Sequence, residues 1–118
     1  MVSVILLVTN PKQGGSKTAK LLANPEADEA GIFAMPNVTS EAGLNFYGAN
    51  LKLMAERWTR PDARYGRIHH WIIHNGVDFG WVWINAGRKS HVQFMSLYHR
   101  SMILTDLIVR QYDPYAKV

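Results

Sequence analysis

The side chains best suited to chemistry lie together in one stretch, HHWIIHNGVDFGWVW, at residues 69–83. This stretch holds three of the five histidines and three of the four tryptophans of the 118-residue chain, with Asn75 and Asp78 between them. Imidazole rings bind metal ions and transfer protons, whereas exposed indole rings and amide groups suit ligands with both apolar and polar faces, such as sugars. Two kinds of site therefore have to be weighed, a histidine metal site and a sugar-binding surface.

The histidine spacing argues against a metal site. If residues 67–74 form a strand, His70 and His74 share one face but lie about 13 Å apart, at about 3.3 Å per residue. That separation is too large for both rings to bind one ion. A helix would bring them together, but the apolar residues between them and the glycine that follows disfavour a helix. We therefore predict packed or hydrogen-bonded histidines, with no metal and no cofactor.

Two strands and two long helices must position these residues. Residues 2–8 (VSVILLV) and 67–74 (RIHHWIIH) are apolar on both faces, which predicts strands that are covered on both sides. Apolar residues recur at three- and four-residue steps over residues 41–60 and 91–112, which predicts two amphipathic helices. The predicted apolar stripes are Leu44, Tyr47, Leu51, Met54 and Trp58 in the first helix and Phe94, Leu97, Tyr98, Leu104, Leu107, Ile108 and Tyr112 in the second.

Local signals mark where the two long helices begin. Thr39 or Ser40 precedes the first helix and can accept hydrogen bonds from its free backbone N–H groups. Ser90 and Gln93 have the spacing of a capping box at the start of the second helix. These caps set the starts of both helices from sequence alone.

The segment TNPKQGGS, residues 9–16, has the context of a phosphate-binding loop, because it follows a strand and precedes a short helix predicted for residues 17–23. Its pattern departs from a P-loop, since a serine separates the glycine pair from the lysine that follows. A flexible turn is favoured, and a small α/β domain that binds a phosphorylated ligand at Gly14 and Gly15 stays as an alternative. Residues 24–40 are predicted to form a long loop.

The order strand, helix, strand, helix predicts an α/β fold with parallel strands. One alternative stays open, because Asn75-Gly76 between two apolar runs is also a strong hairpin signal. A hairpin would return residues 77–84 antiparallel beside the second strand. The adjacent Ile72 and Ile73 do not alternate with polar residues, as a one-sided hairpin strand would, and they favour the parallel arrangement.

The composition limits the partners. With 47% hydrophobic and 19% charged residues the chain has the make-up of a globular domain. The net charge is +4, but the basic residues are scattered rather than gathered in a stripe, so we predict no nucleic-acid partner. The longest apolar run, residues 4–8, is far short of the ~20 residues of a membrane span, and no signal-peptide pattern surrounds it. We predict no membrane partner, and the absence of cysteine leaves the compartment unknown.

The same stretch resembles a known group of enzymes. The run WII-x-N-x-V, an apolar strand that ends in asparagine, looks like the fourth-strand motif of clan A glycoside hydrolases, which are (β/α)8 barrels. More specifically, residues 55–87, 33–43 and 96–118 resemble an uncharacterised glycoside-hydrolase-like barrel family near that clan. The resemblance implies that residues 1–118 are a single fragment of such a TIM-type barrel domain, covering roughly its third and fourth βα units.

The resemblance also implies roles for individual residues. The family's strand ends in Asn-Glu, where the asparagine binds the sugar 2-hydroxyl and the glutamate is the general acid/base. Asn75 falls on that asparagine, but Gly76 stands at the glutamate position and has no side chain to protonate a leaving group. The nucleophile would lie on a later strand, and Asp78 is displaced from position 76 by about 6.6 Å along an extended chain. We therefore expect no catalytic residue and no glycosidase activity in this chain alone.

Two functional hypotheses follow. The first is a glycoside-hydrolase-like barrel portion that lacks its proton donor. The second is a non-catalytic carbohydrate-binding or interaction module, in which Asn75, Trp81, Trp83 and Asn10 line a sugar-binding surface and Trp71 packs in the core. We also predict self-association through the strand edges that a partial barrel leaves exposed.

Overall fold

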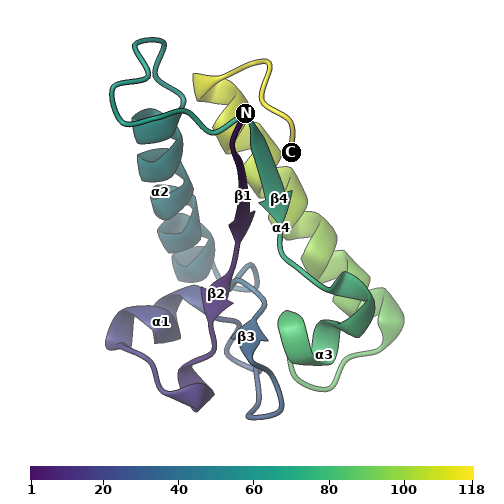
Figure 1. Ribbon diagram of the computed structural model, residues 1–118. Coiled ribbons are helices and arrows are strands. Elements are labelled where there is room, and N and C mark those ends of the chain that lie inside the picture. Colours follow the sequence, from purple (N-terminus) through teal and green to yellow (C-terminus); the bar gives the residue numbers. More distant parts are fainter.

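The computed structural model describes residues 1–118, and its centre is a pair of parallel strands with two long helices packed on one side (Figure 1). The helices α2 (Glu41–Trp58) and α4 (His91–Tyr112) follow the strands β1 (Ser3–Leu6) and β4 (His70–Ile73), which confirms a mixed α/β fold. The remaining elements are short: β2 (Val8–Thr9), η1 (Pro11–Gln13), α1 (Lys17–Leu22), β3 (Phe33–Ala34), η2 (Val77–Phe79) and α3 (Gly80–Trp83).

The strands β1 and β4 pair in parallel, with Ser3 opposite His70 at the start of the ladder. This pairing confirms the parallel arrangement and shows that the hairpin alternative is wrong. The residues after Asn75-Gly76 do not return along β4 but turn into η2 and α3. The turn is made by positive φ angles, 65° at His74 and 61° at Gly76, which take the chain out of the strand direction.

The first strand is shorter than the predicted run of residues 2–8. Pairing with β4 stops at Leu6, and Val8 then pairs with Ala34 in the antiparallel ladder of β2 and β3. The prediction that residues 24–40 form only a loop is therefore wrong. The strand inside this segment is two residues long, which is too short to show any alternation in the sequence.

Only one face of the parallel pair is covered. Leu6, Trp71 and Ile73 belong to the hydrophobic core that α2 and α4 complete, and Trp71 is 1% exposed, as predicted for a core residue. On the other face, Ile5 and Ile72 are 46% and 44% exposed. The prediction that both faces are covered is wrong for these residues, because both long helices lie on the same side of the sheet (Figure 1).

A single parallel bridge lies on the other edge of β4. After α4 the chain comes back so that Lys117 pairs in parallel with His70. The backbone N–H of Trp71 donates to the Lys117 carbonyl at 2.8 Å, and the Lys117 N–H donates to the His69 carbonyl at 3.3 Å. Strand β4 thus has a parallel neighbour on each edge, β1 along its length and Lys117 at its start.

The long helices follow their predicted bounds closely. Ser40 caps α2, and Ser90 and Gln93 form the predicted capping box of α4. Three residues of the predicted stripes, Leu44, Leu107 and Tyr112, are exposed instead of buried. The two helices pack against each other as well as on the sheet, and this turns their buried faces away from those positions. Neither helix, nor any shorter one, has the length and apolar character needed for crossing a membrane.

Candidate functional site

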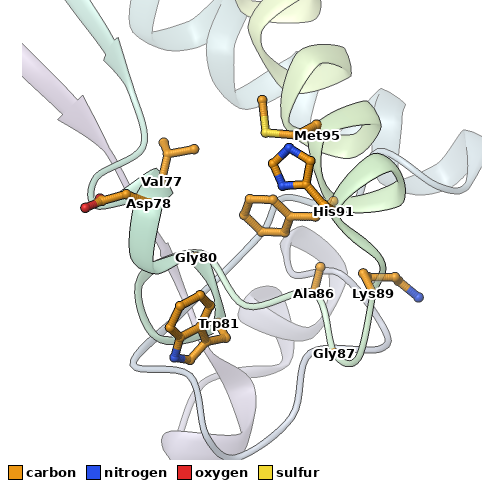
Figure 2. Close-up of a pocket in the computed structure, with 10 residues that line it drawn as sticks. Val77, Asp78, Gly80, Trp81, Ala86, Gly87, Lys89, His91 and Met95 are labelled. Atoms are coloured by element: carbon orange, nitrogen blue, oxygen red, sulfur yellow. The ribbon is translucent and has the colours of Figure 1, made fainter.

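A cavity of about 320 Å³ lies beyond the carboxyl end of β4, between η2 and α3 on one side and the start of α4 on the other (Figure 2). We call it the Trp81 cavity. Its lining combines apolar side chains with three ionisable ones: Val77, Trp81, Phe94 and Met95 together with Asp78, Lys89 and His91. Its volume falls in the range of small-molecule sites, and the carboxyl ends of parallel strands are where α/β folds place them. The Trp81 cavity is therefore the candidate functional site.

Trp81 is the predicted site residue whose position agrees best with ligand binding. Its side chain is 58% exposed and lies beside the ring of Phe79, with 4.4 Å between the ring centroids and 53° between their planes. Phe79 is itself 47% exposed, so the two rings form an exposed aromatic surface, of which Trp81 lines the cavity. Asn75, at the end of β4, is also exposed and two residues before η2. Adjacent exposed aromatic rings, unlike single exposed apolar residues, make a contiguous patch of the kind that marks binding surfaces.

The Trp83 ring packs against other residues of the protein and has a structural role. Its ring stacks on Phe33 with 6.2 Å between the centroids and 24° between the planes. It also fills the space beside Gly76, where an added Cβ would lie only 2.5 Å from the Trp83 Cδ1 atom. Position 76 therefore requires glycine twice over, for its φ of +61° and for the close indole ring. The local geometry therefore explains why glycine stands at position 76, whether or not a related protein has glutamate there.

Asn10 does not lie on the exposed surface where we predicted it. Its side chain is 0% exposed, and its Nδ2 group donates to the backbone carbonyls of Asp28 and Gly31 at 2.8 and 2.6 Å. Its Oδ1 atom accepts from the N–H of Lys12 at 3.0 Å. These hydrogen bonds hold the loop after α1 in place. A buried amide has to find its hydrogen-bond partners within the protein, so the Asn10 side chain is engaged in structure and not in ligand binding.

Asn85 is the residue that organises the site and that sequence reasoning missed. Its Oδ1 accepts from the N–H groups of Asp28 and Gly87, both at 2.9 Å. Its Nδ2 donates to the Asp28 carboxylate at 2.9 Å and to the Trp81 carbonyl at 2.7 Å. The side chain is 2% exposed and ties the end of α3 to the loop after α1. The available signal was a lone amide at the end of the apolar run WVWI.

A glycine brings α3 close to α4 and so closes one side of the cavity. A Cβ at Gly80 would lie 2.2 Å from the Phe94 Cζ atom, so only glycine allows this approach. Gly80 and Phe94 both line the Trp81 cavity.

The ionisable groups of the cavity do not converge on one point. Figure 2 shows the Asp78 carboxylate directed away from His91. The Lys89 amino group forms an ion pair with Glu26, outside the set of residues that line the cavity. General acid/base chemistry needs a donor and an acceptor within reach of one reacting atom. The arrangement is therefore suited to holding a ligand and not to acid/base chemistry.

His74 is buried behind the site and is held by two elements. Its Nδ1 lies 2.9 Å from the Leu6 carbonyl and its Nε2 lies 3.0 Å from Ser101 Oγ. A carbonyl oxygen only accepts, so Nδ1 carries the hydrogen in this contact. Burial lowers the pKa of His74, and the hydrogen bond to Leu6 opposes that shift. His74 thus joins β1, β4 and α4 as a neutral ring.

This burial predicts a pH-dependent stability. Because the folded-state pKa of His74 is below its ordinary value of 6.5, the unfolded chain binds more protons at mildly acidic pH. We expect the His74 contribution to the free energy of unfolding to be complete above about pH 6.5 and to decrease as the pH falls toward the folded-state pKa, by up to about 1.4 kcal/mol per pH unit. Urea unfolding between about pH 8 and pH 5 measures it. His74→Gln should have a flatter profile, and an equal slope in both proteins would contradict the assignment.

The glycine pair of residues 9–16 lies between two short helices, η1 and α1. Ser16 caps α1 through a hydrogen bond from the Ala19 N–H, and Asn10 caps the preceding η1. Neither Gly14 nor Gly15 lines the Trp81 cavity. The segment is a turn between two short helices, as the favoured interpretation held.

Comparison with protein families gives one match over the whole chain. A family model described as "Family of unknown function (DUF5722)" matches residues 1–118. Comparison with curated proteins and with solved structures finds no match.

Proposed function

Since the chain belongs to the DUF5722 family, whose function is unknown, we propose from its geometry that it forms part of the wall of a glycoside-hydrolase-like (β/α)8 barrel and binds carbohydrate in the Trp81 cavity. In this proposal the chain binds the carbohydrate, but it does not supply the general acid that would protonate a leaving group. Two features support the barrel, and the exposed aromatic surface carries the binding function.

The strand arrangement supports the barrel. In a (β/α)8 barrel each parallel strand is followed by a helix on the outside, and the next strand lies beside it. Here β1 is followed by α2 and β4 by α4, and Lys117 forms a single parallel bridge on the free edge of β4. The order of these strands in the sheet is their order in the sequence.

The exposed face of the sheet also supports the barrel. Ile5 and Ile72 lie on the face away from α2 and α4, which corresponds to the barrel interior. Barrel interiors are filled by bulky branched side chains from neighbouring strands. The same apolar face is where self-association of this chain would bury surface.

The observation that carries the binding function is the exposure of Trp81 at a cavity beyond the carboxyl end of β4. An indole face stacks on the apolar face of a sugar ring, and polar groups around it hydrogen-bond the hydroxyls. Asp78 and His91 supply such polar groups from η2 and α4. Asn75 lies at the end of β4, where the resemblance assigns contact with a sugar hydroxyl.

Removal of the Trp81 ring tests the proposal. We expect Trp81→Ala to weaken the binding of neutral oligosaccharides by about tenfold, which corresponds to the loss of one good aromatic contact. Calorimetry measures the affinity without depending on the fluorescence of the residue removed. Trp58→Phe on α2, outside the cavity lining, is the control and should bind as wild type does. Equal affinity of Trp81→Ala and wild type, or no binding at millimolar sugar, would refute the proposal.

A further inference from the structure

A second cavity, of about 360 Å³, lies between η1 and the chain that leaves α1. We call it the lysine cavity. Six residues line it, and two of them are lysines: Pro11, Lys12, Lys20, Asn24, Pro25 and Ala27. Three acidic residues, Glu26, Asp28 and Glu29, lie within residues 10–29, and the Glu26 carboxylate pairs with Lys89. None of the three forms an ion pair with Lys12 or Lys20.

Neither lysine of this cavity forms an ion pair within the chain, whose ion pairs involve Arg60, Arg67, Lys89 and Arg110. The nearby carboxylate of Asp28 accepts hydrogen bonds from the Ala30 N–H and from Asn85 Nδ2, which hold it in the loop. Two unpaired ammonium groups on one cavity favour an anionic ligand.

The wall of the lysine cavity also contains a hydrogen-bond donor without an acceptor. Asn24 is 1% exposed, and its Oδ1 accepts from the Glu26 N–H at 2.9 Å. Its Nδ2 group is buried and has no partner. Buried polar groups in proteins are nearly always hydrogen-bonded, and an exception calls for a reason. An oxygen atom of a ligand that reaches this wall would give the Asn24 amide the acceptor that it lacks.

From these observations we infer that the lysine cavity is a binding site for a tetrahedral oxyanion, a phosphate or sulfate group held by Lys12, Lys20 and the Asn24 amide. A tetrahedral oxyanion presents several acceptor oxygens at once, which matches two ammonium groups and one amide donor. The site is separate from the glycine pair, because neither Gly14 nor Gly15 lines it.

The two cavities are lined by segments that contact each other. Glu26, which lies between Pro25 and Ala27 of the lysine cavity, pairs with Lys89 of the Trp81 cavity, and a Cβ at Gly87 would lie 2.3 Å from the Glu26 carbonyl oxygen. No residue lines both cavities, so a ligand that occupies both has to extend across this contact. A saccharide that carries a phosphate or sulfate ester is the ligand class that fits both cavities, and this assignment rests on the proposed function.

Titration with inorganic phosphate and inorganic sulfate tests the oxyanion site directly. At constant ionic strength, we expect saturable shifts of the Asn24 side-chain amide signals in ¹H–¹⁵N NMR spectra. Lys12→Gln/Lys20→Gln should bind about tenfold more weakly, since charge-assisted hydrogen bonds are lost. The control, Lys17→Gln/Lys52→Gln, changes the net charge equally at two exposed lysines outside the cavity lining and should bind as wild type does. Equal weakening in both double variants, or shifts that never saturate, would overturn the inference.

Matched saccharides then separate the two proposals. Tighter binding of a sulfated or phosphorylated oligosaccharide than of its neutral counterpart, lost in Lys12→Gln/Lys20→Gln, supports the shared ligand. If neutral and anionic saccharides bind equally and the inorganic ions do not bind, the oxyanion site is refuted and carbohydrate binding stands. If the ions bind and no saccharide does, the oxyanion site stands and the proposed function is refuted.

Discussion

Replacement of Asn85 by alanine is expected to lower the free energy of unfolding by roughly 2–4 kcal/mol. The Asn85 side chain is 2% exposed and makes four hydrogen bonds, two to backbone N–H groups, one to the Asp28 carboxylate and one to the Trp81 carbonyl. Alanine removes all four and leaves the N–H groups of Asp28 and Gly87 without their acceptor. Urea unfolding followed by far-ultraviolet circular dichroism measures the loss.

Asn85→Asp distinguishes hydrogen bonding from shape. Aspartate has nearly the same size as asparagine, but it places a carboxylate oxygen where Nδ2 now faces the Asp28 carboxylate and the Trp81 carbonyl. We expect it to destabilise at least as much as alanine, because an acceptor then faces two acceptors. Asn50→Ala is the control, since Asn50 makes one side-chain hydrogen bond on α2, to the Phe46 carbonyl, and should change stability by ~0.5 kcal/mol. A loss as small as this in Asn85→Ala would disprove the organising role of Asn85.

Gly76→Glu, the substitution that would restore the Asn-Glu motif, is expected to destabilise the protein by roughly 2–5 kcal/mol and to give no glycosidase activity. A side chain at position 76 is strained by the φ of +61° and meets the Trp83 ring, 2.5 Å from the Cβ position. Asp78 is the only acidic residue in the cavity lining, and its carboxylate is directed away from His91 (Figure 2), so we expect no acid/base pair to form with a glutamate at position 76. Unfolding in urea and hydrolysis of an aryl glycoside measure the two effects.

Alanine variants separate the backbone strain from the contact with Trp83. Gly66 has a φ of +81° and nothing within 4 Å of its Cβ position, so Gly66→Ala should cost only the backbone strain of about 1 kcal/mol. Gly76→Ala should cost more, and part of the difference should disappear when Trp83 is also replaced by alanine. Equal costs at positions 66 and 76, or hydrolysis by Gly76→Glu above the rate in buffer, would show that position 76 has room for a side chain.

The helices could be predicted from the sequence because their signals are local. The capping box of Ser90 and Gln93 and the periodicity that follows it act within one or two turns, and α4 begins and ends at the predicted residues. Parallel pairing was also predictable, since Ile72 and Ile73 are both apolar and neighbouring. Which apolar residues of a helix are buried could not be predicted, because this depends on how the two helices pack against each other. Leu44 and Leu107 are examples.

The candidate site was predicted only in part. Trp81 is exposed and lines a cavity, whereas Asn10 is buried and Asn85 was overlooked. The sequence does not distinguish these two asparagines from Asn75. Each of the two buried ones bonds to groups at residues 28–31, and Asn85 is more than fifty residues away from its partner at Asp28.

By itself, then, the sequence determined the two long helices, their caps and the direction of the two strands, because the signals for these lie within a few positions of one another. Only the tertiary structure decided what Gly76 and the asparagines do. A Cβ at position 76 is excluded by the ring of Trp83, and Asn85 is held by a loop from the other half of the chain. Asn85 and Asp28 are 57 residues apart, and Trp83 reaches Gly76 only because η2 and α3 fold the chain back, so neither contact has a local sequence signal.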